Sequence, residues 1–188
     1  MKATKLKHLP NILTSCNMAI GILVICSMIH NDSLSDRKLA CYLVYVAVVL
    51  DGFDGYFARY LNASSDMGKQ LDSFADFVTF GIAPITIFIS GLKFIPWYVM
   101  LILLLYSLAG GFRLARYNLQ NHSEYFTGLP ITASGFIMVT VLLIHSYLDR
   151  EITGIFLILF LILTVILSIL MVSKFPAKRI IKNKKGYK

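Results

Sequence analysis

The sequence predicts an all-α integral membrane protein, a bundle of six transmembrane helices with a short N-terminal interfacial helix. Of the 188 residues, 57% are hydrophobic, and the mean hydropathy is +0.71. A helix needs about 20 mostly apolar residues to cross the hydrocarbon core of a bilayer, and the chain contains six runs of about that length. These runs are continuous and do not alternate between apolar and polar residues, which favours helices over a β-barrel.

The elements follow one another with short polar connections and without an internal repeat, which predicts a single domain over residues 12–173. Residues 1–11 are basic, lack a signal-peptide cleavage site, and predict a helix on the membrane surface. The last run is the strongest because it contains no charge after Glu151. A basic tail, residues 174–188, follows it. The predicted spans cover residues 12–30, 38–60, 70–91, 95–117, 129–148 and 152–173.

The distribution of lysine and arginine predicts the orientation. Six spans place both termini on one side of the membrane, and basic residues accumulate in cytoplasmic segments. One side receives Lys2, Lys5, Lys7, Arg59, Lys69, Arg113, Arg116 and the basic residues from Lys174 to Lys188, whereas the other receives only Arg37, Lys38, Lys93 and Arg150. We therefore expect a multi-pass protein of the cell membrane with both termini in the cytoplasm. The net charge of +8 follows from this bias and from the tail, which we expect to contact anionic lipid headgroups and not nucleic acid.

Four aspartates lie within or at the edges of the apolar runs: Asp51, Asp54, Asp72 and Asp76. A carboxylate at membrane depth costs about 2.5–3.5 kcal/mol on insertion scales, so it marks a functional site by default. The basic residues between them are too few to balance them, and a divalent cation is the simplest source of the missing positive charge. Oxygen ligands suit Mg²⁺, Mn²⁺ or Ca²⁺, whereas zinc and copper favour histidine and cysteine.

The predicted topology brings these acids together. Asp51 and Asp54 fall in the cytoplasmic half of the second span, and Asp72 and Asp76 fall in the first turns of the third. The spacings i,i+3 and i,i+4 place each pair on one helix face. Two antiparallel helices can then present four carboxylates to one cavity just below the cytoplasmic surface.

Small residues accompany the acids. Gly55 and Ala58 follow Asp51 by four and seven positions, and Gly68 precedes Asp72 by four. Each of them alone is typical of close helix packing in membranes. Their joint spacing with the acids predicts a face that is open to a bulky ligand.

Three arginines lie at the same predicted side of the membrane. Arg59 can pair with an aspartate or bind a substrate phosphate through two hydrogen bonds. Arg113 and Arg116 lie near the cytoplasmic end of the fourth span, after Gly110 and Gly111. They can anchor the helix end at the membrane surface or form an anion site facing the acids.

The pattern of these residues resembles the signature of the CDP-alcohol phosphotransferases. Every fixed position and every gap of that signature is present in Asp51-x-x-Asp54-Gly55-x-x-Ala58-Arg59, then eight residues to Gly68, then Asp72 and Asp76. The resemblance covers nearly the whole chain, because the six spans agree with the family fold.

The resemblance extends to a subfamily, the membrane-embedded phosphatidylserine synthases. The stretches that carry it are 73–84, 113–118 and 126–130. Thr132 stands where this pattern leads us to expect a second proline, and we expect it to lie away from the metal site.

The resemblance implies transfer of a phosphatidyl group from a CDP-linked lipid (CDP-diacylglycerol or an ether-lipid equivalent) to the hydroxyl of L-serine, with release of CMP. It also implies two divalent ions, Mg²⁺ or Mn²⁺ with Ca²⁺ as a third candidate, and a homodimer. Two such ions can clamp a pyrophosphate and stabilise the leaving phosphate.

The resemblance further implies a role for each residue of the motif. Asp51, Asp54 and Asp72 would bind one metal ion, while Asp51, Asp72 and Asp76 would bind the second. Asp76 is also the candidate base for the seryl hydroxyl. The CDP-lipid would contact Asp54, Gly55, Ala58, Arg59 and Gly68, and the acceptor or a phosphate would contact Arg113 and Arg116.

Other functions remain open on the sequence. The same chemistry could use glycerol phosphate or inositol phosphate as the acceptor. A cation transporter is a remote alternative. Transporter sites tend to lie near the bilayer midplane between repeats, whereas these acids are predicted near one face and the sequence shows no repeat. A structural protein could pair its acids with Arg59, Arg113 and Arg116. A synthase with a covalent histidine in a His-x-Lys motif is excluded, because no histidine has a lysine two positions later.

Overall fold

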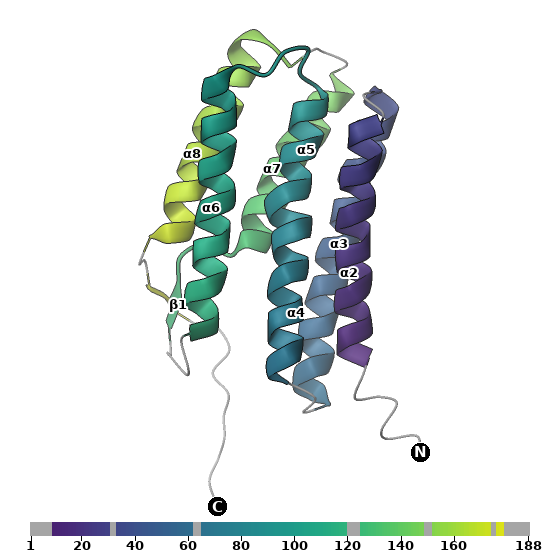
Figure 1. Ribbon diagram of the computed structural model, residues 1–188, viewed down its shortest axis with the longest axis vertical. Coiled ribbons are helices and arrows are strands. Elements are labelled where there is room, and N and C mark those ends of the chain that lie inside the picture. The colour runs from purple at the N-terminus through teal and green to yellow at the C-terminus, as the bar shows by residue number, and fades with distance from the viewer. Residues whose placement is uncertain are drawn as a thin grey trace, which may run out of the picture.

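The computed structural model describes residues 9–30, 33–61, 65–119, 125–148, 152–173 and 176–178. Its helices in chain order are α2 (Leu9–His30), α3 (Leu34–Tyr60), α4 (Asp66–Asp76), the π-helical segment η1 (Phe77–Ile82), α5 (Ala83–Ser90), α6 (Trp97–Leu119), α7 (Ile131–Tyr147) and α8 (Gly154–Val172) (Figure 1). Two of the helices begin at serines: the Oγ atoms of Ser33 and Ser65 accept hydrogen bonds from the backbone N–H groups of Asp36 and Gly68. Such caps satisfy donors that the first helical turn leaves free.

Within the described residues, five helical segments are long and apolar enough to cross a membrane: α2, α3, the continuous segment Asp66–Ser90, α6 and α8. The remaining predicted span, residues 129–148, corresponds to α7, which is apolar but has only 17 residues. It begins at Ile131 because Pro130 is its N-cap. The predicted bundle of apolar helices is therefore confirmed, and the described part of the chain contains five helices long enough to span a membrane and one shorter apolar helix. The predicted interfacial segment, residues 1–11, falls mostly outside the described residues, and its last part from Leu9 belongs to α2.

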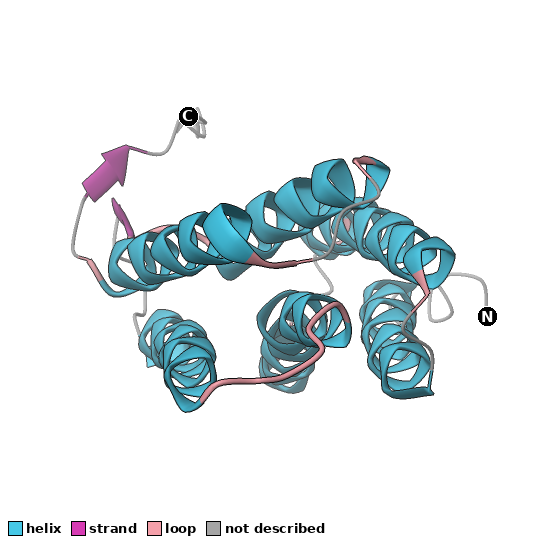
Figure 2. Ribbon diagram, turned by 90° about the horizontal axis from the view of Figure 1, so that it is seen from above, coloured by secondary structure: helices cyan, strands magenta, loops and turns pink. Residues whose placement is uncertain are grey.

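The helices form two layers when the bundle is seen from above (Figure 2). In Figure 1, α2, the segment α4–α5 and α6 lie toward the viewer, and α3, α7 and α8 lie behind them. The segment η1 contacts α2, α3, α6 and α7, so it lies at the centre of the bundle. The core around it includes the fully buried side chains of Phe80, Phe88, Tyr106, Met138 and Phe160.

The π-helical segment η1 starts directly after Asp76 and is held by neighbouring helices. The Tyr106 hydroxyl donates a hydrogen bond to the Phe80 carbonyl (3.0 Å), and the Thr79 hydroxyl donates to the Asn17 carbonyl (3.1 Å). On α7, a Cβ at Gly135 would lie 2.8 Å from the Phe80 carbonyl oxygen, so only glycine permits this approach. Single π-turns inside α-helices are frequent at functional sites. Here the turn fixes the helix immediately beyond a candidate metal ligand.

A short ribbon is an exception to the predicted all-α fold within the described part of the chain. The strands β1 (Tyr125–Thr127) and β2 (Pro176–Lys178) pair antiparallel, with Phe126 opposite Ala177. The second strand belongs to the predicted basic tail. The ribbon thus joins the segment before α7 to the segment after α8.

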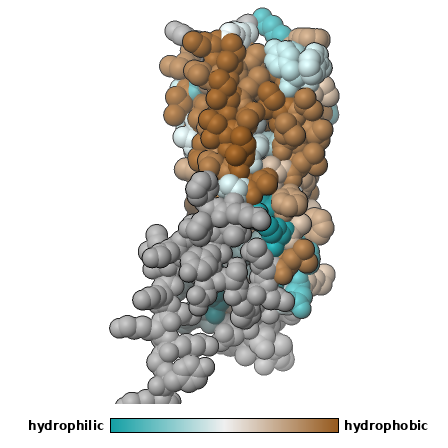
Figure 3. All heavy atoms as spheres, turned by 90° about the vertical axis from the view of Figure 1, so that its left-hand side faces the viewer, coloured by the Kyte–Doolittle hydropathy of each residue, from teal (hydrophilic) through white to brown (hydrophobic). Residues whose placement is uncertain are grey.

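The outer surface of the bundle is largely apolar. In Figure 3, which faces the side of α6 and α8, hydrophobic residues cover most of the upper part. Large contiguous apolar surfaces of this kind mark contact with a membrane or a partner. The exposed side chains include Leu101, Leu104, Leu105 and Leu108 of α6 and Ile155, Ile158, Ile162 and Ile166 of α8.

Candidate active site

Three of the four predicted carboxylates form one cluster. Asp51 of α3 and Asp72 and Asp76 of α4 each offer one oxygen, and these oxygens lie within 4.8 Å of one another. Asp76 is 8% exposed, and its Oδ1 atom has no hydrogen-bond partner among the described residues. A buried carboxylate oxygen is costly without a compensating partner. Carboxylate oxygens are the ligands that Mg²⁺ and Mn²⁺ prefer in proteins. Because three carboxylates lie together here and one of their oxygens has no hydrogen-bond partner among the described residues, the cluster fits such a divalent cation.

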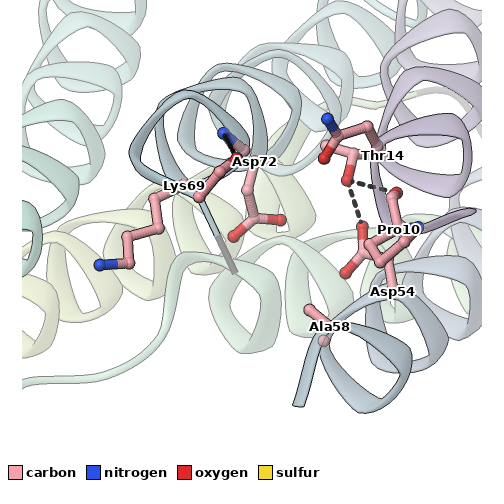
Figure 4. A pocket seen from close by; sticks show the side chains of 10 residues that line it. Pro10, Thr14, Asp54, Ala58, Lys69 and Asp72 are labelled. Carbon is pink, nitrogen blue, oxygen red and sulfur yellow. Dashed lines mark hydrogen bonds between the residues drawn. The ribbon is translucent and has the colours of Figure 1, made fainter. Parts of the chain in front are cut away.

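The fourth carboxylate, Asp54, is not part of this cluster and lines an adjacent pocket. Its side chain is 4% exposed, and its Oδ2 atom accepts a hydrogen bond from the Thr14 hydroxyl of α2 at 2.9 Å (Figure 4). Asp72 belongs to both features, because it lies in the cluster and also lines the pocket. The cluster and the pocket are therefore continuous through Asp72.

The pocket lies between the beginning of α2, the second half of α3 and the beginning of α4. Figure 4 shows the carboxylates of Asp54 and Asp72 on opposite sides of it, while the Lys69 side chain extends away from Asp54. The predicted contacts Gly55, Ala58 and Gly68 are all part of its lining. The complete lining comprises Pro10, Asn11, Thr14, Asp54, Gly55, Ala58, Ser65, Gly68, Lys69 and Asp72.

The two glycines of the pocket have different surroundings. A Cβ at Gly68 would lie 3.0 Å from the Ser65 hydroxyl and 3.1 Å from the Asn11 side-chain oxygen, which is tighter than ordinary packing. A Cβ at Gly55 would lie 3.6 Å from Nη1 of Arg59, an ordinary contact. The Arg59 guanidinium therefore lies beside Gly55, next to the pocket but outside its described lining.

The two arginines of α6 have different surroundings. Arg113 is 8% exposed, and its Nε atom has no hydrogen-bond partner among the described residues. Arg116 instead donates to the end of α8: its Nη1 lies 3.0 Å from the Val172 carbonyl oxygen, and its Nη2 lies 3.4 Å from that of Ser173. The structure therefore gives the two arginines different surroundings, because the guanidinium of Arg116 is engaged by backbone carbonyls. The anion site expected at Arg113 and Arg116 stays a prediction.

Several polar contacts of the site were not predicted from the sequence. Thr14 is one of them. Thr132 is another: its hydroxyl donates to Oδ2 of Asp51 at 3.4 Å, so the expectation that it lies away from the metal site is wrong. The side-chain amide of Asn118 donates to the Ser73 hydroxyl at 2.9 Å and joins the end of α6 to α4. The available signal was the presence of hydroxyl residues near the ends of apolar runs, which does not identify their partners.

Comparison with known proteins identifies the family. The sequence model described as CDP-alcohol phosphatidyltransferase matches residues 7–170. The chain belongs to this family. The match confirms the family that the aspartate pattern predicted.

Curated relatives of this family are similar to the chain over most of its length. The CDP-diacylglycerol–serine O-phosphatidyltransferase of Bacillus subtilis is 39% identical over 136 residues, which cover 71% of this chain and 75% of the relative. The protein of the same name from Helicobacter pylori (strain J99) is 35% identical over 172 residues, or 87% of this chain and 69% of the relative. That of Methanocaldococcus jannaschii is 32% identical over 175 residues, or 92% of this chain and 75% of the relative.

The structure explains why the spacing in the motif of the CDP-alcohol phosphatidyltransferases matters. The eight residues between Arg59 and Gly68 take the chain from the last turn of α3 to the first turn of α4. The two halves of the motif therefore face each other across antiparallel helices.

Proposed function

We propose that this protein transfers a phosphatidyl group from CDP-diacylglycerol, or its ether-lipid equivalent, to the hydroxyl of L-serine, releasing CMP and forming phosphatidylserine. The observation that carries the proposal is the cluster of Asp51, Asp72 and Asp76 beside a pocket lined by Asp54, Gly55 and other motif residues. The names of the similar proteins support serine as the acceptor.

The carboxylates would hold two divalent ions, Mg²⁺ or Mn²⁺. Asp51, Asp54 and Asp72 would bind one ion, and Asp51, Asp72 and Asp76 would bind the other. The position of Asp72 in both the cluster and the pocket supports this sharing. When bound, such ions neutralise charge on the phosphorus oxygens and stabilise the leaving phosphate.

The pocket residues would bind the nucleotide end of the lipid. Gly55, Ala58 and Gly68 leave room for the cytidine or ribose to approach the backbone of α3 and α4. Arg59 lies beside Gly55 and would contribute positive charge on the nucleotide side. The lipid chains would remain among the apolar side chains that cover the outer surface of the helices.

Asp76 would act as the general base. A seryl hydroxyl is a poor nucleophile until it loses its proton. A carboxylate has two oxygens with about four lone-pair sites, so Asp76 can bind an ion and still accept that proton. Oδ1 of Asp76 is buried and accepts no hydrogen bond from a described residue, which leaves lone pairs free for both roles. The seryl oxygen then forms a bond to the lipid phosphorus, and the phosphorus–oxygen bond to CMP breaks.

Arg113 is our candidate for binding the carboxylate of serine or a lipid phosphate. Its side chain is buried on α6, and the hydrogen bond between Asn118 and Ser73 holds the end of that helix against α4. The same role was predicted for Arg116, but its contacts with the end of α8 favour another role, which is proposed below. The predicted homodimer stays a prediction.

We propose that the protein lies in the cell membrane with the site and both termini on the cytoplasmic side. The excess of lysine and arginine on the side of Arg59, Lys69 and Arg113 supports this orientation. A site just below that surface suits a substrate with a soluble nucleotide and buried chains.

A direct assay tests the proposed function. The purified protein is incubated with CDP-diacylglycerol, Mg²⁺ or Mn²⁺ and one of three acceptors, L-serine, glycerol phosphate or inositol phosphate, and released CMP is measured. We expect CMP release with serine, its loss in excess chelator, and its return when Mg²⁺ or Mn²⁺ is added. Release with another acceptor but not with serine would change the acceptor, and full turnover in excess chelator would refute the role of the metal.

A further inference from the structure

Thr132 connects α7 to the carboxylate cluster. It is the second residue of α7, and its hydroxyl donates to Oδ2 of Asp51 on α3 at 3.4 Å. A carboxylate has about four lone-pair sites, so this bond leaves others free for a cation. A hydrogen bond of this kind orients a metal-binding side chain. A proline at this position would have no hydroxyl to donate.

The turn before α7 lies directly against the end of α8. Gly128 has a φ of +81°, and a Cβ there would lie 2.4 Å from the Met171 carbonyl oxygen. The backbone N–H of Leu129 donates to the Leu170 carbonyl at 3.0 Å. Glycine is therefore required at position 128 both by its left-handed conformation and by this close approach.

Arg116 binds the same end of α8. Its guanidinium donates to the carbonyl oxygens of Met171 (3.5 Å), Val172 (3.0 Å) and Ser173 (3.4 Å). The last carbonyls of a helix have no partners within the helix, and a cation placed there is favourable. We call Arg116, Gly128 and Leu129, together with the carbonyls they meet, the α8 cap.

We propose that Thr132 is a positioning residue that orients the Asp51 carboxylate, and that the α8 cap determines where Thr132 lies. Pro130, the N-cap of α7, restricts the backbone between the cap and Thr132. A shift of the cap therefore moves the first turn of α7 and the hydroxyl that contacts Asp51. Arg116 acts through this chain of contacts, without touching a substrate. The proposal rests on the proposed function in that Asp51 is a metal ligand.

Three variants test Thr132. Thr132→Val removes the hydroxyl and keeps the side-chain shape, and Thr132→Ser keeps the hydroxyl. Thr164→Val is the matched control, because the buried Thr164 hydroxyl donates to the Phe160 carbonyl of its own helix. Mn²⁺ affinity is measured from the EPR signal of free Mn²⁺ in titrations of the detergent-solubilised protein, a readout that needs no turnover.

We expect Thr132→Val to weaken Mn²⁺ binding about tenfold, the lower end of the range for residues that orient metal ligands, because its contact is long. Thr132→Ser should restore most of the affinity, and Thr164→Val should leave it unchanged. Mn²⁺ binding and kcat at the wild-type level in Thr132→Val would overturn the proposal. If the wild-type protein released no CMP, the proposed function would fail, but the Mn²⁺ comparison would still decide the role of Thr132.

A second experiment tests the α8 cap. Arg116→Gln should weaken Mn²⁺ binding, and adding Thr132→Val should cost less than the sum of the two single effects, because both act on the same contact. Arg116→Lys keeps the positive charge but loses the planar fork that reaches several carbonyls at once, so it serves as a milder second probe if Arg116→Gln does not fold and should also weaken Mn²⁺ binding. Normal Mn²⁺ affinity in a folded Arg116→Gln with a raised KM for serine would assign Arg116 to the acceptor and overturn the cap.

Discussion

Replacement of Thr14 by valine tests how the pocket is built. The Thr14 hydroxyl lies 2.9 Å from Oδ2 of Asp54 and 3.0 Å from the Pro10 carbonyl oxygen. A hydroxyl has one hydrogen to donate, and a charged acceptor forms the stronger bond, so an ionised Asp54 receives it. Valine has nearly the same shape as threonine but no donor. The substitution thus leaves a carboxylate that is 4% exposed without this partner.

The expected cost follows from the kind of bond that is lost. Hydrogen bonds to charged groups contribute about 1.5–3 kcal/mol, and each 1.4 kcal/mol corresponds to about a tenfold change. Because Asp54 lines the pocket, we expect kcat/KM for CDP-diacylglycerol to fall about 10- to 150-fold in Thr14→Val. Thr14→Ser keeps the donor and should lose much less.

The assay measures CMP release against CDP-diacylglycerol concentration at saturating serine and metal. Ser15→Ala is the matched control, because Ser15 is the next residue and its hydroxyl donates to the Asn11 carbonyl of its own helix. We expect this control to keep the wild-type kcat/KM. A wild-type kcat/KM in Thr14→Val would show that Asp54 needs no donor from α2, and the assignment of this pocket to the nucleotide would lose its support.

Further predictions concern the motif and α6. Asp76→Asn should lower kcat by about 10²- to 10⁴-fold, which is the typical contribution of a general base. Asp66 is exposed, so Asp66→Asn should keep near wild-type CMP release. Equal rates in both variants would refute the role of Asp76. Gly68→Ala should raise KM for CDP-diacylglycerol, because its Cβ would lie 3.0 Å from the Ser65 hydroxyl. Gly52→Ala should leave this KM unchanged, because its Cβ would meet no described atom within 4 Å. Equal KM values in the two variants would refute a role of Gly68 in binding the CDP-lipid. Arg113→Ala should raise KM for serine about 10- to 150-fold. A rise for CDP-diacylglycerol alone would assign Arg113 to the lipid phosphate.

The sequence predicted the helices and the acidic residues of the site because both depend on strong local signals. Apolar runs of membrane length define most spans, and acids such as Asp51 and Asp76 stand out within them because burying a carboxylate in a membrane is costly. The shortening of the predicted span 129–148 to α7 depends on the turn at Pro130, and that turn depends on contacts with α8.

The sequence could not predict how neighbouring side chains on one helix would diverge. Residues at i and i+3 lie about 60° apart around a helix axis, because each residue advances by about 100°. Asp51 and Asp54 therefore face different neighbours: Asp51 meets Thr132 of α7, and Asp54 meets Thr14 of α2. A shared helix face predicts proximity, but the packing of the other helices decides the partner.

The same geometry separates Arg113 from Arg116. Their spacing of three predicted one anion site, yet Arg113 is buried while Arg116 reaches the last carbonyls of α8. A helix end supplies several carbonyls without partners within the helix, so it competes with a substrate for any arginine within reach. The position of the end of α8 relative to α6 is a tertiary feature that no local pattern encodes.

The two threonines allow the metal cluster and the nucleotide pocket to be examined separately. Thr132 contacts Asp51, which belongs to the carboxylate cluster, and Thr14 contacts Asp54, which lines the pocket. Thr132→Val should therefore act first on metal affinity, and Thr14→Val should act first on the affinity for CDP-diacylglycerol. Asp72 belongs to both features, so Asp72→Asn should weaken both affinities. An Asp72→Asn variant with only one affinity changed would show that the cluster and the pocket do not share this carboxylate.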